Sequence, residues 1–233
     1  METIDQKQAL QLIKEGKKIT FLTGAGISTP SGIPDYRSLS GVYQGIEQPE
    51  YLLSATCLIE EPQKFYHFIQ TLYHPNAQPN MIHSKIAALE KTKETWVISQ
   101  NIDGLHRAAG SQNLVDFHGN LYDCYCRDCG QKVSVEEYLT SDRHLTCGGQ
   151  LRPGIVLYEE GLDQQAIATA IKAVEQSDLI VIVGTSFQVH PFCDLIHYAS
   201  EEAVVLVINQ TTIQLKRHAY FLNEEAESIF ENI

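Results

Sequence analysis

The stretch ITFLTGAGISTPSGIPDYRS, residues 19–38, begins as a buried strand and continues as a glycine turn. Gly24 and Gly26 directly follow the apolar run, so backbone N–H groups at this turn could approach a pyrophosphate closely. A lone G-x-G is also common in tight turns after any strand, and threonine stands at position 29, where the full dinucleotide fingerprint has glycine. The turn therefore indicates nucleotide binding without establishing it.

The second half of the stretch cannot continue as the helix that usually follows such a turn. Pro30 and Pro34 lack a backbone N–H and restrict the residues before them, which excludes an immediate regular helix. We therefore predict an ordered loop close to the glycines, and this loop carries Asp35, Tyr36 and Arg37.

The rest of the chain alternates short apolar runs with amphipathic patterns. The apolar runs are rich in Val and Ile and are continuous, which is typical of strands covered on both faces of a parallel sheet. They occupy residues 18–24, 95–101, 113–119, 178–184 and 203–209, and helical patterns occupy 4–16, 83–92 and 162–177. This alternation predicts an α/β fold with a Rossmann-like, doubly wound parallel sheet.

Two regions interrupt this alternation and predict a smaller domain. Residues 38–80 are helical and turn-rich, and residues 121–153 carry most of the cysteines. We expect residues 1–37, 81–120 and 154–233 to form the Rossmann-like domain. The helical insertion and a zinc-ribbon insertion would together form the second domain.

Composition excludes several classes of function. The 233 residues carry a net charge of −12, from 17 basic and 29 acidic side chains, which argues against a protein that binds nucleic-acid backbones. The charge is compatible with cationic partners such as lysine-rich peptides. No apolar run approaches the roughly 18 residues of a membrane helix, and residues 1–18 lack the apolar core of a signal peptide. We expect a cytoplasmic protein that does not bind membranes.

Polar side chains gather where the predicted strands end, and ligands of open α/β sheets bind at this edge. Gln100, Asn101 and Asp103 follow one strand, and His118 follows the next. Asn101 or Asp103 could simply cap a helix, and a loop histidine is often only solvated, but histidine is also the commonest general base. Further small polar residues that could bind phosphate or ribose end the last two strands: Gly184, Thr185, Ser186 and Asn209.

The clustered cysteines indicate a structural metal site. Cys126 and Cys129 form a C-x-x-C pair, and His144 and Cys147 repeat the same spacing, which together give a closed Cys3His zinc set. Cys124 could replace His144 as the fourth ligand, and a cluster of reduced thiols without metal is a third possibility.

Six segments, in order, resemble the sirtuin family of NAD-dependent protein deacylases, and most of all its compact bacterial members. They are GAGISTPSGIPDYRS, SQNIDGLH, FHGN, CGGQLRPGIVLYEE, GTSFQV and VIN, and they span residues 20–210. The resemblance implies that NAD is a co-substrate, that a lysine acyl group is transferred to ADP-ribose, and that nicotinamide is released. It also explains the two prolines, because in this family the loop after the glycines folds over the cofactor.

The resemblance implies a role for each matching residue. His118 would be the general base, with Asn101 and Asp103 also catalytic. NAD would be bound by Gly24, Ala25, Gly26, Ser28, Asp35, Tyr36, Arg37, Gln100, Asn101, Asp103, His118, Gly184, Thr185, Ser186 and Asn209. The acyl-lysine substrate would be bound by Val156, Leu157, Tyr158, Glu159 and Tyr66, with residues 154–160 pairing with the peptide as a strand and Phe187–Val189 flanking its other side.

The sequence departs from the family pattern at positions that bear on the substrate. Tyr36 stands where phenylalanine is usual, and Tyr158, Glu159 and Glu160 stand for Phe-Gly-Glu, so that Glu159 adds charge that would favour basic peptides. Desuccinylating members carry a Tyr-x-x-Arg pair, but here Tyr66 is followed by Ile69, which predicts a preference for neutral acyl groups.

Two other functions fit the same residues. The pocket could transfer ADP-ribose to a protein or hydrolyse NAD, and a non-enzymatic module could simply bind NAD or ADP-ribose. His118 beside Asn101 and Asp103 argues against the non-enzymatic interpretation.

Overall fold

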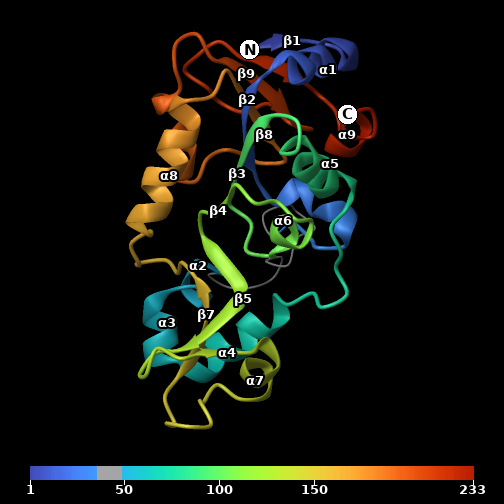
Figure 1. The fold of residues 1–233 in the computed structure, drawn as a ribbon. Coiled ribbons are helices and arrows are strands. Elements are labelled where there is room, and N and C mark those ends of the chain that lie inside the picture. The colour runs from blue at the N-terminus through green and yellow to red at the C-terminus, as the bar shows by residue number, and fades with distance from the viewer. Residues whose placement is uncertain (36–48) are drawn as a thin grey trace.

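The structure is a computed structural model that describes residues 1–35 and 49–233, so Tyr36 and Arg37 lie outside the described residues. Figure 1 shows two layered parts joined by several chain crossings. One part holds a large sheet between helices and carries both termini. The other part, at the opposite end of the molecule, holds shorter helices and a small sheet.

The large sheet confirms the predicted doubly wound fold. Its strand order is β1-β10-β9-β8-β2-β3-β4, and every neighbouring pair is parallel. After β1, the chain adds strands outward in one direction from β2 and then in the other from β8, so the topological switch point lies between β2 and β8. The strands are β1 (Glu2–Thr3), β2 (Lys18–Thr23), β3 (Glu94–Ser99), β4 (Leu114–Asp116), β8 (Leu179–Val183), β9 (Val204–Ile208) and β10 (Tyr220–Leu222).

The central strands are apolar on both faces because helices cover both. Phe21 and Leu22, neighbours on β2, point to opposite faces and are both fully buried, in separate core clusters. Burying such a side chain contributes about 1.5–3 kcal/mol to folding. The Leu22 face packs against α8 (Gln164–Glu175) and the 3-10 helix η3 (Phe192–Tyr198). The Phe21 face packs against α1 (Gln6–Glu15), α5 (Met81–Leu89) and α9 (Ala226–Phe230).

Polar residues fix where the covering helices begin. Asp5 caps α1 and Asn80 caps α5, each in a capping box that satisfies backbone N–H groups of the first turn. The Asp163 carboxylate accepts hydrogen bonds from the Gln165 and Ala166 N–H groups and starts α8. The sequence therefore sets these starts locally; α1 and α8 begin within the predicted helical ranges, and α5 begins two residues before the predicted 83–92.

The smaller part has its own core. An antiparallel sheet of order β6-β5-β7 packs against short helices, and this core draws side chains from residues 52–73 and from 121–157, that is, from both predicted insertions. The division of the chain into two domains with the stated bounds stays a prediction. The elements of the smaller part are α2 (Pro49–Leu52), α3 (Ala55–Glu60), α4 (Pro62–Thr71), β5 (Gly119–Cys126), β6 (Lys132–Val133), α7 (Val135–Thr140) and β7 (Leu151–Ile155).

The structure differs from the sequence prediction at the edges of the large sheet. Strand β4 is shorter than the predicted run 113–119, because Gly119 already begins β5 of the small sheet. Strands β1 and β10 carry no apolar run long enough to be recognised, since one has two residues and the other three. No helix in the described ranges is long and apolar enough to cross a membrane.

Candidate functional site

A cavity of about 450 Å³ lies at the carboxyl ends of β2, β3 and β8, at the switch point of the sheet. Residues from the smaller part, including Leu53 and Ile155, close its other side. The predicted site residues that line it are Gly24, Ala25, Ser28, Asp35, Gln100, Asn101, Asp103, His118, Val156, Leu157, Tyr158, Glu159, Gly184, Thr185 and Ser186. The fold therefore gathers most of the predicted residues into one cavity.

The glycine turn after β2 is required by close packing against the end of β8. A Cβ at Gly24 would lie 2.6 Å from the Thr185 Cβ, and one at Gly26 would lie 2.9 Å from the Gly184 Cα. The Gly26 N–H donates to the Gly184 carbonyl at 2.8 Å. The missing side chains therefore let the turn pack directly against the backbone at the end of β8, and Gly24 lines the cavity there.

The chain after this turn forms 3-10 turns in place of a helix, as the prolines predicted. They are η1 (Ala25–Ile27) and η2 (Thr29–Ser31), and Pro30 lies in the first turn of η2, where a missing N–H costs nothing. Gly32 ends η2 in the left-handed conformation with φ of 81°. Threonine at position 29 is accommodated because no regular helix packs there.

A hydrogen-bonded network ties the β3 loop to the glycine turn. The Asn101 Nδ2 donates to the Gly24 carbonyl and to the Ser28 Oγ, both at 3.1 Å. The Ser28 Oγ donates to the Asp103 Oδ2 at 2.7 Å, and the Leu105 N–H donates to the Asp103 Oδ1 at 2.9 Å. Burial raises the pKa of the Asp103 carboxyl, although both hydrogen bonds favour its ionised form. The network holds Asn101 and Asp103 in fixed orientations at the cavity.

The ring of His118 has a defined hydrogen-bonding direction. It is partly buried, and its Nδ1 lies 3.2 Å from the Gln100 carbonyl oxygen. Because a carbonyl oxygen only accepts, this contact places a hydrogen on Nδ1 and makes Nε2 the basic nitrogen of the neutral ring. Gln100 is itself held by donation from its Nε2 to the Thr185 Oγ1 at 2.8 Å.

Residues 156–160 form the wall of the cavity that faces the smaller part. The Val156 N–H donates to the His118 carbonyl at 2.9 Å, which joins this wall to the His118 loop. The Tyr158 N–H donates to the Leu53 carbonyl at 2.9 Å, and the Tyr158 carbonyl accepts from the Ala55 N–H at 3.1 Å. Pairing of 154–160 with a peptide strand stays a prediction, and the backbone of Tyr158 is already paired within the chain.

Glu159 occupies a backbone conformation that glycine adopts more easily. Its φ is 75°, and its carboxylate accepts hydrogen bonds from the Thr56 N–H at 2.9 Å and the Thr56 Oγ1 at 2.7 Å. The side chain thus bonds the wall to the first turn of α3, which offsets the cost of the left-handed backbone. Glu159 adds charge at the cavity, as predicted, but its carboxylate is held by Thr56.

Among the described residues named from the sequence, Gly26, Tyr66, Phe187 and Asn209 do not line this cavity. Tyr66 is 9% exposed in the small core, where its hydroxyl donates to the Tyr138 carbonyl at 2.9 Å. The Asn209 Nδ2 donates to the carbonyls of Thr185 and Thr211, and Phe187 packs in the core of the large sheet. Among the residues predicted to flank the peptide beside Phe187, Val189 does line the cavity.

The structure also adds lining residues that no sequence pattern indicated. They are single apolar or polar side chains from separate segments, and nothing in their local sequence marks them. They include Ile33, Glu50, Leu53, Leu162, His190 and Pro191.

The charged side chains in the described lining of the cavity are acidic. Its described lining includes five carboxylates and neither lysine nor arginine. The carboxylates belong to Asp35, Glu50, Asp103, Glu159 and Glu160. Such a lining favours cationic groups and disfavours anionic ones near these side chains.

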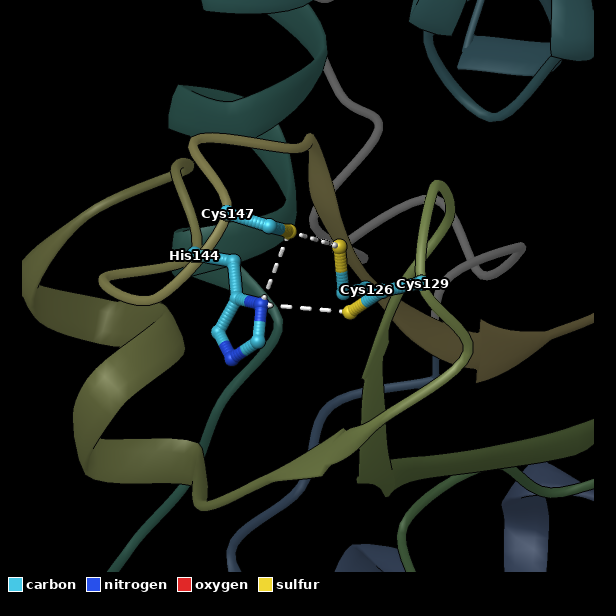
Figure 2. Close-up of side chains that lie close together, drawn as sticks. All are labelled: Cys126, Cys129, His144 and Cys147. Carbon is cyan, nitrogen blue, oxygen red and sulfur yellow. Dashed lines mark hydrogen bonds between the residues drawn. The ribbon is translucent and has the colours of Figure 1, made fainter.

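The four predicted metal ligands converge in the smaller part, at the end of β5. Figure 2 shows the side chains pointing toward one another, with the His144 Nδ1 turned toward the sulfurs. The His144 Nδ1 lies 3.3 Å from the Cys129 Sγ and 3.1 Å from the Cys147 Sγ, and the Cys126 and Cys147 sulfurs are 3.5 Å apart. Ligand atoms of a tetrahedral zinc lie about 3.5–3.8 Å apart, so a small outward movement would admit the ion.

Two matching turns present these ligands. In Cys126–Gly130 and in His144–Gly148, the glycine N–H donates to the carbonyl of the first ligand, at 2.9 Å and 2.8 Å. The two glycines have φ of 73° and 72°, the left-handed conformation that closes each turn. Cys124 is excluded from the cluster, because its buried thiol donates to the Leu121 carbonyl at 3.4 Å.

A buried histidine pair lies beneath the cavity and gives a pH prediction. Burial lowers the pKa of His83 to about 4 and the pKa of His106 well below its usual value. Their ring centroids are 4.8 Å apart, and the His106 Nε2 contacts the Thr23 Oγ1 at 3.2 Å. Because the unfolded chain binds protons near pH 6.5 and the folded chain does not, we expect stability to fall as pH drops from about 6.5 toward 4.

The measurement is the free energy of unfolding in denaturant between pH 4 and 7 for the wild type and His83→Gln. Each proton that is taken up only on unfolding adds about 1.4 kcal/mol per pH unit to the slope of the unfolding free energy against pH. In His83→Gln this slope should therefore be smaller by up to that amount. An unchanged slope would contradict the assignment of this proton uptake to His83.

Comparison with known proteins agrees with this geometry. The sequence model of the Sir2 family matches residues 24–191. The chain is 64% identical to the NAD-dependent protein deacetylase of Enterococcus faecalis over 233 residues, covering 100% of this chain and 98% of the relative.

Two solved structures share the whole fold. A Sir2 with a deacetylated p53 peptide and 3'-O-acetyl ADP-ribose is 31% identical, with a TM-score of 0.88 over 98% of this chain and 96% of that one. A Sir2 bound to a propionylated peptide is 30% identical, with a TM-score of 0.85 over 98% and 97%. By sequence and by fold alike, this chain belongs to the Sir2 family.

Proposed function

We propose that this chain is an NAD-dependent protein-lysine deacylase that transfers the acyl group of acyl-lysine to ADP-ribose and releases nicotinamide. The observation that carries this proposal is the single cavity that unites the glycine turn, Asn101, Asp103, His118 and the wall 156–160. The identity with a deacetylase supports the same activity. So does the similar Sir2 that holds a deacetylated peptide with acetyl ADP-ribose.

The cavity fits a dinucleotide at its inner end. Gly24, Ala25 and Ser28 of the glycine turn line this end, and the Asn101–Ser28–Asp103 network presents polar groups beside them. NAD supplies the ADP-ribosyl group that receives the acyl group, with nicotinamide as the leaving group. We assign NAD binding to Gly24, Ala25, Gly26, Ser28, Asp35, Gln100, Asn101, Asp103, Gly184, Thr185, Ser186 and, for the adenosine half, Asn209.

His118 acts as the general base in this proposal. Its Nδ1–H is directed to the Gln100 carbonyl, so Nε2 carries the lone pair in the neutral ring, and we assign this nitrogen as the acceptor of a proton from a ribose hydroxyl. The neighbouring rings of Phe117 and Phe192, at centroid distances of 5.6 Å and 6.3 Å, limit how far the imidazole can turn. The base is therefore held in one orientation before substrate binds.

The acyl-lysine enters between the two domains along Val156, Leu157 and Tyr158. A half-buried salt bridge supports this wall from behind, because the Arg152 Nη2 donates to the Glu160 carboxylate at 3.0 Å and to the Ile155 carbonyl at 2.6 Å. The acidic lining suits lysine-rich peptides, and the partners we propose are acylated proteins, with no role for nucleic acid or membranes. A cytoplasmic location stays a prediction from the sequence.

We propose that Cys126, Cys129, His144 and Cys147 hold one structural zinc ion. Three sulfurs and one imidazole are an accepted tetrahedral set, and four protein ligands leave no open position for chemistry. The ion would fix the two ligand turns and so the outer end of the small core. Catalysis at the cavity would depend on zinc only through this support.

Product analysis tests the proposed activity. Purified protein incubated with NAD and an acetyl-lysine peptide should yield deacetylated peptide, nicotinamide and O-acetyl-ADP-ribose, measured by mass spectrometry. ADP-ribosylated protein, or free ADP-ribose without peptide turnover, would replace the proposal by ADP-ribosyl transfer or NAD hydrolysis. Binding of NAD without nicotinamide release from any acyl-peptide would replace it by a binding module.

The acyl group preferred should be neutral. No lysine or arginine lies among the described lining residues, and Ile69, where desuccinylating members carry arginine, is fully buried. The carboxylate of a succinyl group would therefore lie near other carboxylates and would find no cation to pair with. We expect this to raise the activation free energy by at least about 1.4 kcal/mol, which lowers kcat/KM tenfold relative to the acetyl group. The kcat/KM values for acetyl- and succinyl-lysine versions of one peptide measure this, and faster desuccinylation would contradict it.

A further inference from the structure

We propose that His190, Cys193 and Asp194 form a second divalent-cation site of zinc type at the rim of the cavity. One ligand atom from each residue, an imidazole nitrogen, a sulfur and a carboxylate oxygen, lies within 4.8 Å of the others. Cys193 is half-buried and lies beside two other side chains that can bind metal.

The local backbone brings these side chains together. Cys193 and Asp194 are consecutive residues in the first turn of η3, and His190 lies two residues before η3 begins. The Cys193 N–H donates to the Val189 carbonyl at 2.9 Å and the Asp194 N–H donates to the Pro191 carbonyl at 3.1 Å, which fixes the turn from which all three extend. The arrangement is therefore set by ordered backbone.

The distances suit capture of a small ion. The His190 Nδ1 lies 2.7 Å from the Asp194 Oδ2 and 3.5 Å from the Cys193 Sγ. Around a tetrahedral zinc such pairs would lie about 3.3–3.8 Å apart, so the nitrogen and oxygen must separate by roughly 0.6 Å, while the nitrogen–sulfur distance already fits. The exposed fractions of 73% for the His190 side chain and 43% for Asp194 leave room for that movement.

The donor set selects the class of cation. Ca²⁺ and Mg²⁺ prefer oxygen ligands only, whereas zinc accepts nitrogen, sulfur and oxygen together. A simple surface ion pair between His190 and Asp194 would not need the sulfur, and such exposed pairs contribute little to stability. The convergence of Cys193 on the same point is what distinguishes this cluster from an ion pair.

This site differs in character and place from the four-ligand cluster. It lies in the large domain, and its three protein ligands leave one tetrahedral position for water or another ligand. His190 and Pro191 also line the cavity, so an ion here would lie at its edge. Binding would displace the thiol proton of Cys193 to solvent and would form a metal–thiolate bond.

The test is metal titration of the full chain already loaded with one equivalent of Zn²⁺. Added Co²⁺ should bind as one further equivalent and give tetrahedral visible bands together with a thiolate-to-cobalt charge-transfer band. Cys193→Ser should abolish the charge-transfer band and weaken binding at least tenfold, and His190→Ala should do the same. His197→Ala, an exposed histidine in the same 3-10 helix, is the matched control and should behave as wild type.

Metal analysis after gel filtration separates the two sites. Wild type should retain close to two equivalents of metal at a small excess of Zn²⁺, and Cys193→Ser should retain one. Equal stoichiometry and equal spectra for wild type, Cys193→Ser and His190→Ala would overturn the proposal. Loss of the second metal equivalent in the control variant His197→Ala would also overturn the proposal.

Discussion

Replacement of His118 by alanine should lower kcat for deacetylation by about 10²- to 10⁴-fold, the usual contribution of a positioned general base. The variant removes the ring whose Nδ1 is directed to the Gln100 carbonyl, and with it the nitrogen that we assign as proton acceptor. The glycine turn and the Asn101–Ser28–Asp103 network do not depend on this ring, so ADP-ribose should still bind. Steady-state kinetics and calorimetric ADP-ribose binding measure the two quantities.

Two further variants make this result specific. His218→Ala removes an exposed histidine far along the chain, paired with Glu2, and should leave kcat unchanged. His118→Gln keeps a polar side chain of similar size without a basic nitrogen, and should be as slow as the alanine variant. Turnover within tenfold of wild type for both His118 variants would show that another group accepts the proton.

Loss of the histidine ligand should remove the metal from the small domain. His144→Ala leaves three sulfurs and no imidazole at the cluster, and we expect the bound zinc to fall by about one equivalent relative to wild type on dialysis. Structural zinc contributes apparent free energies of about 10–16 kcal/mol in small zinc-dependent units, so thermal unfolding of the variant should begin many degrees earlier. Metal analysis and calorimetry measure both effects.

Cys124→Ala is the matched control for this prediction. It removes another thiol of the same strand, one that is 2% exposed and bonded to the Leu121 carbonyl. It should retain the full metal content. Its free energy of unfolding should fall by only about 1–2 kcal/mol, the contribution of a small buried side chain. If Cys124→Ala lost the metal and His144→Ala kept it, the fourth zinc ligand would be Cys124 and not His144.

Local features of the sequence predicted the architecture correctly. Continuous Val- and Ile-rich runs indicate strands covered on both faces, because only a parallel sheet between helices buries every residue of a strand. Gly24 and Gly26 predicted a tight turn after the strand, and the structure has that turn packed closely against the end of β8. Both inferences depend on spacing along the chain, which the sequence contains directly.

Spacing could not choose between the two candidates for the fourth ligand. Cys124 and Cys126 are two residues apart on β5, and the period of a strand places both side chains on the same face. The choice depends on where the turn His144–Gly148 packs against the turn Cys126–Gly130, and that contact is made across the sheet. Tertiary structure therefore selects His144 and leaves Cys124 in the small core.

The sequence by itself determined the sheet, the two ligand pairs and the polar residues that end the strands, since periodicity, turn chemistry and ligand spacing are local. Only the tertiary structure decided that Tyr66 is a core residue, that Leu53 and Tyr158 join the cavity wall to the small domain, and that Cys193 meets His190 and Asp194. These outcomes depend on the packing of surfaces that are distant in the chain or on a turn without a sequence signature. Side-chain identity alone does not specify them.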